Sequence, residues 1–77
     1  MAYRDTVGNW IIHDEPREDE VDSQIIYTRY SQWCELNGER ALSSAYFGRR
    51  IKTLGWERIQ KRTGDIRHWS YRKLGEK

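Results

Sequence analysis

The chain has 77 residues, of which 36% are hydrophobic and 34% charged, so it allows one small domain and no second hydrophobic core. Cys34 is the single cysteine, which excludes an internal disulfide framework and a cysteine-based zinc site. The net charge of +2 conceals two halves of opposite sign: residues 1–39 hold three basic against nine acidic residues, a net charge of −6, and residues 40–77 hold eleven against three, a net charge of +8. Such a split suggests a polyanionic partner for the basic half, although a solvated basic surface would give the same pattern.

The first predicted helix covers about residues 3–13. Its apolar stripe at helical spacing consists of Tyr3, Val7, Trp10 and Ile11. We expect Pro16 to end this helix, and the dense acidic run around it predicts a loop over residues 14–22. A solvated linker is the interpretation of this loop that we favour. An acidic binding segment and a strip that mimics DNA are the alternatives.

The second predicted helix covers about residues 23–37. Asp22 or Ser23 suits its N-cap, and Asn37-Gly38 is a typical stop signal. Its core stripe consists of Ile26, Tyr30, Trp33 and Cys34. Because Cys34 lies on this stripe, we interpret it as a small buried hydrophobic residue and not as a nucleophile.

The third predicted helix covers about residues 43–54, with Ser43 as its N-cap. Phe47, Ile51 and Leu54 fall on one face at helical spacing, which predicts that this face is buried. The opposite face collects cationic, hydrogen-bonding and small side chains, namely Ala45, Tyr46, Arg49, Lys52 and Thr53, with Arg50 on the flank. This outer face is suited to a polyanion.

A β-hairpin is predicted over about residues 56–74. Two segments rich in β-branched and aromatic residues are separated by Thr63-Gly64-Asp65, which is a hairpin signal. By alternation, Trp69 and Tyr71 share one face of the second strand, and His68, Ser70 and Arg72 share the other. Four cations cluster toward the tip: Arg58, Lys61, Arg62 and Arg67.

Three helices followed by a basic hairpin is the order of a winged helix-turn-helix domain, so we predict an α+β fold with residues 1–77 as one such domain. The third helix would be the recognition helix in a DNA groove, and the hairpin, as the wing, would grip flanking phosphates. The candidate DNA-binding residues are Ser43, Ser44, Tyr46, Arg49, Arg50, Lys52, Thr53, Arg58, Lys61, Arg62, Arg67 and His68.

An ordered series of short motifs runs through most of the chain. A tyrosine-rich helix ends in Trp-Cys, and Asn-Gly, Leu-Ser, Phe-Gly with two basic residues, Leu-Gly-aromatic and a basic hairpin with a tryptophan follow. The residues are Tyr27, Tyr30, Trp33, Cys34, Asn37, Gly38, Leu42, Ser43, Phe47, Gly48, Arg49, Arg50, Leu54, Gly55, Trp56 and Trp69. In this order they resemble the C-terminal domain of poxvirus-type primase-helicases of phages, plasmids and other mobile elements, and the resemblance covers roughly Val7 to Leu74.

This resemblance implies a DNA-binding winged helix attached to a superfamily III helicase motor. The partners it implies are DNA, expected to be double-stranded, and a helicase motor domain or other replication proteins. It also implies the cytoplasm of a bacterial host or of a virus-infected cell. The N-terminal residues lack the pattern of a signal peptide, and no apolar stretch approaches the ~20 residues that span a bilayer, so we expect no membrane partner.

The sequence shows none of the motifs that would indicate catalysis. It has no G-x-x-x-x-G-K-[ST] phosphate loop and no paired carboxylates on an apolar background. His13 and His68 have no cysteine or histidine at metal-ligand spacing. We therefore expect no enzyme activity, cofactor or metal in this chain, and any helicase or primase activity would lie in other domains of a larger parent protein.

Two functions from different classes remain open. The first is a DNA-binding module of a replication protein. The second is a protein-docking module of a replication complex without its own DNA specificity, since winged helices also bind proteins and a fold does not determine its function. RNA binding is a weaker third hypothesis, because a helix fits the major groove of B-form DNA better than the deep groove of A-form RNA.

Overall fold

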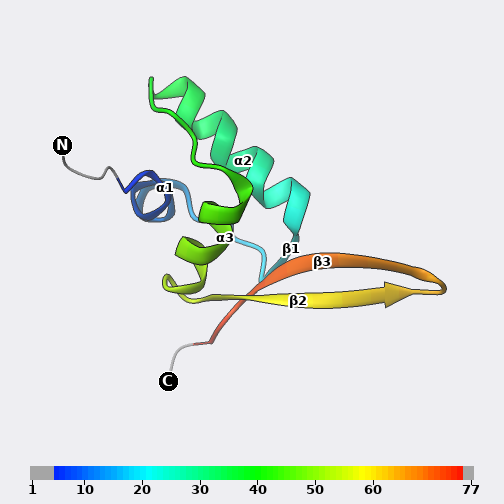
Figure 1. The fold of residues 1–77 in the computed structure, drawn as a ribbon. Helices are drawn as coiled ribbons and strands as arrows, with labels where there is room; N and C mark the ends of the chain where they lie inside the picture. The colour runs from blue at the N-terminus through cyan, green and yellow to red at the C-terminus, as the bar shows by residue number, and fades with distance from the viewer. Residues whose placement is uncertain (1–4, 76–77) are drawn as a thin grey trace.

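The computed structural model describes residues 5–75. The elements in chain order are α1 (Thr6–Asp14), β1 (Glu20–Asp22), α2 (Ser23–Leu36), α3 (Ser44–Lys52), β2 (Trp56–Thr63) and β3 (Ile66–Lys73). The three helices gather at one end of an antiparallel sheet of order β1-β3-β2, and the β2–β3 hairpin projects away from them (Figure 1). The predicted α+β class is confirmed. Tyr3, which we expected in the first helix, lies outside the described residues.

The helix α1 has an N-cap residue at its start, and it ends just before Pro16. The Asp5 carboxylate accepts a hydrogen bond of 3.0 Å from the backbone N–H of Gly8, which is the usual action of an N-cap. At the other end Glu15 takes an extended conformation, with φ −55° and ψ 135°. Helical backbone angles are disfavoured for a residue that precedes proline, which explains why the helix ends at Asp14. The prediction that Pro16 ends this helix is therefore confirmed.

The acidic segment after α1 is not a loop throughout, which corrects the prediction for residues 14–22. Its last three residues form β1, which pairs with β3 so that Val21 lies opposite Tyr71. Val21 is buried in the core, and its acidic neighbours Glu20 and Asp22 alternate to the other face of the sheet. Glu20 forms an ion pair with Lys61 there, which offsets part of the repulsion within the segment.

The N-cap residues of α2 and α3 are those that the sequence predicted. Of the two candidates for α2, Asp22 is the N-cap, and its carboxylate accepts from the backbone N–H groups of Gln24 and Ile25. Ser43 caps α3 through a hydrogen bond from Tyr46 N. The third helix ends at Lys52, two residues before the predicted end, and Leu54 lies in the following turn.

The predicted hairpin is confirmed, and its turn is one residue shorter than the predicted Thr63-Gly64-Asp65. Thr63 pairs with Ile66, so the connection consists of Gly64 and Asp65 alone. Gly64 has φ +62°, a conformation that side chains disfavour and that a two-residue turn with glycine in its first position requires. This turn aligns eight residues of β2 with eight of β3.

Aromatic rings make up much of the hydrophobic core. The buried apolar residues are Val7, Trp10, Val21, Ile26, Tyr30, Cys34, Phe47, Ile51, Trp56 and Tyr71. Phe47 lies among them, with its ring centre 4.9 Å from that of Tyr30 and 6.1 Å from that of Tyr71. Trp33, which we expected on the core stripe, is half-buried at the edge of the core, whereas Trp56 is fully buried.

The Tyr30 hydroxyl joins three segments inside this core. It lies 2.7 Å from the Thr6 hydroxyl in α1 and accepts a hydrogen bond of 2.9 Å from the backbone N–H of Leu42, in the connection between α2 and α3. Nearby, Tyr27 donates to the Leu42 carbonyl. These bonds fix the loop that leads into α3 and therefore the position of the predicted recognition helix.

Candidate nucleic-acid interface

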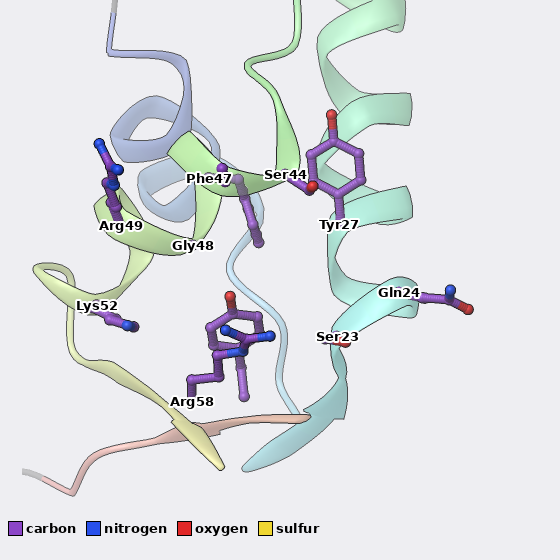
Figure 2. A pocket seen from close by; sticks show the side chains of 11 residues that line it. Ser23, Gln24, Tyr27, Ser44, Phe47, Gly48, Arg49, Lys52 and Arg58 are labelled. Carbon is purple, nitrogen blue, oxygen red and sulfur yellow. The ribbon is translucent and has the colours of Figure 1, made fainter. Parts of the chain in front are cut away.

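An open groove of about 720 Å³ lies between α3, the first turns of α2 and the base of the hairpin (Figure 2). Its lining side chains are Ser23, Gln24, Tyr27, Ser44, Ala45, Phe47, Gly48, Arg49, Lys52, Arg58 and Tyr71. Three of these are cationic, and among the described residues that line it none is acidic. We call this feature the basic groove.

Two of the cations come from the outer face of α3. Arg49 and Lys52 are exposed and one helical turn apart, opposite the buried Phe47 and Ile51. The Arg49 guanidinium lies 5.6 Å from the centre of the Tyr46 ring, a cation–π contact that restrains it on the surface. The predicted division of α3 into a buried apolar face and a cationic outer face is therefore confirmed.

Arg50, which we included among the candidate DNA-binding residues, serves the fold. Its guanidinium donates to both carboxylate oxygens of Asp5, at 3.0 and 2.5 Å, and to the Thr53 hydroxyl at 2.7 Å. The hydrogen bonds from Arg50 are the main reason why the pKa of Asp5 lies below its usual value. Thr53 in turn donates to the Arg50 carbonyl, so both candidates are engaged within the protein.

The hairpin presents two faces of different chemistry. The strand register places Arg58 opposite Tyr71, and Arg62 opposite Arg67, on the face that looks toward the helices. We call it the helix-side face. Within residues 5–75, no carboxylate pairs with any of its three arginines, which leaves their charges available to a ligand.

The opposite face of the hairpin carries cations that already have partners. Lys61 pairs with Glu20, and Arg72 pairs with Glu57. His68 lies directly opposite Lys61 on this face. Lys61 and Arg62 are both candidate DNA-binding residues, but they point to opposite faces of the hairpin and cannot contact the same strip of phosphates, because neighbouring residues of a strand alternate.

The two serines at the start of α3 have different roles. Ser43 is the N-cap, and its hydroxyl accepts a hydrogen bond of 3.4 Å from the backbone N–H of Tyr46. Ser44 lines the basic groove. Three residues of α2 that were not among the candidate DNA-binding residues also line the groove: Ser23, Gln24 and Tyr27. Their placement depends on how α2 packs beside α3, and no local pattern reports that.

A second groove, of about 480 Å³, lies between the end of α1, the loop that follows it and α2. Carboxylates and arginines both line it, including Asp14, Glu18 and Arg29, together with the half-buried Trp33. Glu18 and Arg29 form a bidentate ion pair, in which the guanidinium donates one hydrogen bond to each carboxylate oxygen. This pair lowers the pKa of Glu18 to about 2. We call this feature the mixed-charge groove.

Metal-ligating side chains do not gather anywhere in residues 5–75. No group of three or more histidine, cysteine, aspartate or glutamate side chains in that range is placed to hold a metal ion. Cys34 is buried, as predicted, and burial raises the pKa of its thiol, which disfavours the reactive thiolate. No helix in the described part of the chain is both long and apolar enough to cross a membrane.

No family model matches the sequence, and comparisons with curated proteins and with solved structures found no significant match. The resemblance to primase-helicase C-terminal domains therefore stays a prediction based on the motifs quoted above.

Proposed function

We propose that the protein is a winged helix-turn-helix module that binds duplex DNA, with α3 as the recognition helix and the β2–β3 hairpin as the wing. The observation that carries the proposal is the basic groove. Arg49 and Lys52 from α3 and Arg58 from the hairpin line one open concavity, with no acidic side chain among its described lining residues. Phosphate oxygens are the natural ligands for such a set of cations.

The geometry of α3 supports a role in a DNA groove. The helix is anchored from behind by Phe47 and Ile51, and Arg50 ties it to the start of α1. Ala45 on its outer face is small and exposed, which permits close approach of a ligand. A rigid helix with exposed cations on its outer face can place two side chains at base edges in a major groove.

The sequence resemblance supports a more specific proposal about the parent protein. The module belongs to a replication protein of the primase-helicase kind, and its partners are double-stranded DNA and a helicase motor domain or other replication proteins. Catalysis belongs to other domains of that parent, and the present chain contributes binding alone.

Fluorescence anisotropy with a labelled duplex tests the proposal. Arg49→Ala and Lys52→Ala should each weaken binding, and Arg49→Ala should cost about 1–3 kcal/mol if Arg49 contacts a base edge. Arg17→Ala is a matched control, because it removes one exposed positive charge at the mixed-charge groove. Unchanged affinity for both α3 variants, with an unaltered circular dichroism spectrum, would remove the recognition-helix assignment.

The mixed-charge groove favours protein docking as a second candidate function. It combines carboxylates with Trp33 and with Leu36, whose side chain is 86% exposed at the end of α2. Such a surface suits a basic segment of a replication protein with an apolar anchor. Protein docking would become the better-supported function under two conditions. Both α3 variants would still bind the duplex, and Leu36→Ser would no longer bind the motor domain.

A further inference from the structure

Trp69 lies outside the hydrophobic core, on the hairpin beyond the helices. Trp10 and Trp56 are each 1% exposed, whereas 39% of the Trp69 surface is exposed. Trp69 lies on the helix-side face, opposite Gln60 and two residues nearer the tip than Tyr71. A tryptophan in this position adds little to the core.

The surroundings of Trp69 are cationic on both sides along the hairpin. Toward the helices, the Arg58 guanidinium lies 4.1 Å from the centre of the Trp69 ring. Toward the tip, Arg62 and Arg67 face each other across the two strands. The helix-side face thus alternates arginine, aromatic ring and arginine over the length of the hairpin.

This alternation is the arrangement by which proteins bind single-stranded nucleic acid. Cations follow the phosphates of the unpaired strand, and flat aromatic rings stack on its bases without regard to sequence. In an intact duplex the bases are already stacked on one another, and an aromatic ring gains no base face. The exposed ring therefore favours an unpaired strand at this part of the hairpin.

Arg58 connects the ring to the basic groove. It lines the groove together with Arg49 and Lys52, and it also covers the Trp69 ring. A strand that leaves a duplex held in the groove can therefore pass from Arg58 to Trp69 and on to the arginine pair near the tip.

We propose that Trp69 stacks an unpaired base, so that the protein binds a junction at which single-stranded DNA leaves a duplex. The duplex lies in the basic groove. The unpaired strand follows the helix-side face of the hairpin, where it replaces the flanking duplex phosphates that the arginine pair near the tip contacts on a blunt duplex. This inference rests on the proposed duplex-binding function and adds a second class of ligand to it.

The test compares a blunt duplex with the same duplex carrying a thymidine tail of about 8 nucleotides on either its 3′ or its 5′ strand, a length within the usual site size of single-strand grooves. The unmodified protein should bind one of the tailed probes about tenfold or more tightly than the blunt duplex. Trp69→Leu should abolish that gain and leave blunt-duplex affinity unchanged. Trp69→Phe, which keeps an aromatic ring, should retain most of it.

Two further measurements separate stacking from a structural effect. A 2-aminopurine placed in the tail next to the junction should lose fluorescence on binding, and should keep it with Trp69→Leu. Ile66→Ala is the matched control, because Ile66 is an exposed apolar residue on the opposite face of the same strand. Melting curves followed by circular dichroism verify that each variant is folded.

Each outcome of these measurements supports or overturns the role of Trp69. Equal affinity of the unmodified protein for tailed and blunt probes overturns the inference and leaves the duplex-binding function standing. A gain that survives Trp69→Leu also overturns it. Binding of the tail without the duplex would retain the role of Trp69 and reject the duplex proposal, whereas binding of neither probe would reject both.

Discussion

The Asp5 carboxylate does two tasks at the boundary between α1 and α3. It caps α1 through Gly8 N and receives two hydrogen bonds from Arg50. Arg50, a predicted DNA contact, therefore supports α3 within the protein. Both side chains are partly exposed, so the pair stabilises less than a buried one would.

We expect Asp5→Asn to destabilise the protein by about 1 kcal/mol at neutral pH, because the charge is lost while asparagine still caps the helix. The folded-state pKa of Asp5 is lowered, so its contribution is fully present above the unfolded value of about 3.9 and disappears as the pH falls through the folded value. Urea unfolding of both proteins from pH 7 to pH 2 measures this. A difference that does not shrink in acid would show that the charge of Asp5 is not what stabilises.

Tyr30 provides a second prediction for a single side chain. Tyr30→Phe removes the hydroxyl that contacts Thr6 and Leu42, and leaves the part-buried backbone N–H of Leu42 without its partner. The expected loss is about 1–3 kcal/mol in the free energy of unfolding. Tyr27→Phe is the control, since its half-buried hydroxyl makes one hydrogen bond, to the Leu42 carbonyl, and its loss should cost less.

Among the elements, α3 and the hairpin approach each other closely at Gly48. A Cβ built on Gly48 would lie 2.7 Å from the Tyr71 hydroxyl oxygen and 4.0 Å from the ring carbon that bears it. The glycine therefore sets the distance between α3 and β3, and with it the width of the basic groove.

We expect Gly48→Ala to lower the melting temperature, because the largely buried Tyr71 side chain must shift to make room for the new methyl group. The same substitution in a Tyr71→Phe background should instead be neutral or stabilising by up to about 1 kcal/mol, since alanine favours a helix over glycine. Thermal unfolding of the two single variants and the double variant gives the coupling. Additive effects would mean that the hydroxyl does not limit this contact.

The elements that the sequence predicted well are those whose signals are local. Helical spacing and the caps Asp22 and Ser43 gave α2 and α3, and the turn at Gly64 gave the hairpin. β1 was missed because its three residues form a strand only against β3, about fifty residues later in the chain. The roles of Arg50 and Lys61 were missed for the same reason, since their carboxylate partners are 45 and 41 residues away in sequence.

For the whole molecule, the central expectation is that DNA contacts one face of the hairpin. Arg62→Ala with Arg67→Ala should flatten the log–log salt dependence of duplex binding by nearly two units, because each phosphate contact contributes about 0.9. Lys61→Ala with Arg72→Ala removes the same charge from the opposite face, where both cations are paired, and should change the slope much less.

Anisotropy titrations over a salt series measure both slopes, on a specific and on a random duplex. The arginine variant should weaken binding to the two duplexes by similar factors, since phosphate contacts carry no base information. Equal slopes for the two double variants would mean that the hairpin does not present its helix-side face to DNA.

The alternation of side chains along the hairpin also limits how its length can change. One residue added to each strand between Trp69 and the Arg62–Arg67 pair would move that pair to the far face. Two residues added to each strand would keep the pair on the helix side and carry it about 6.6 Å further from the helices. Natural or engineered versions of this hairpin that keep the same charged face should therefore differ in strand length by even numbers.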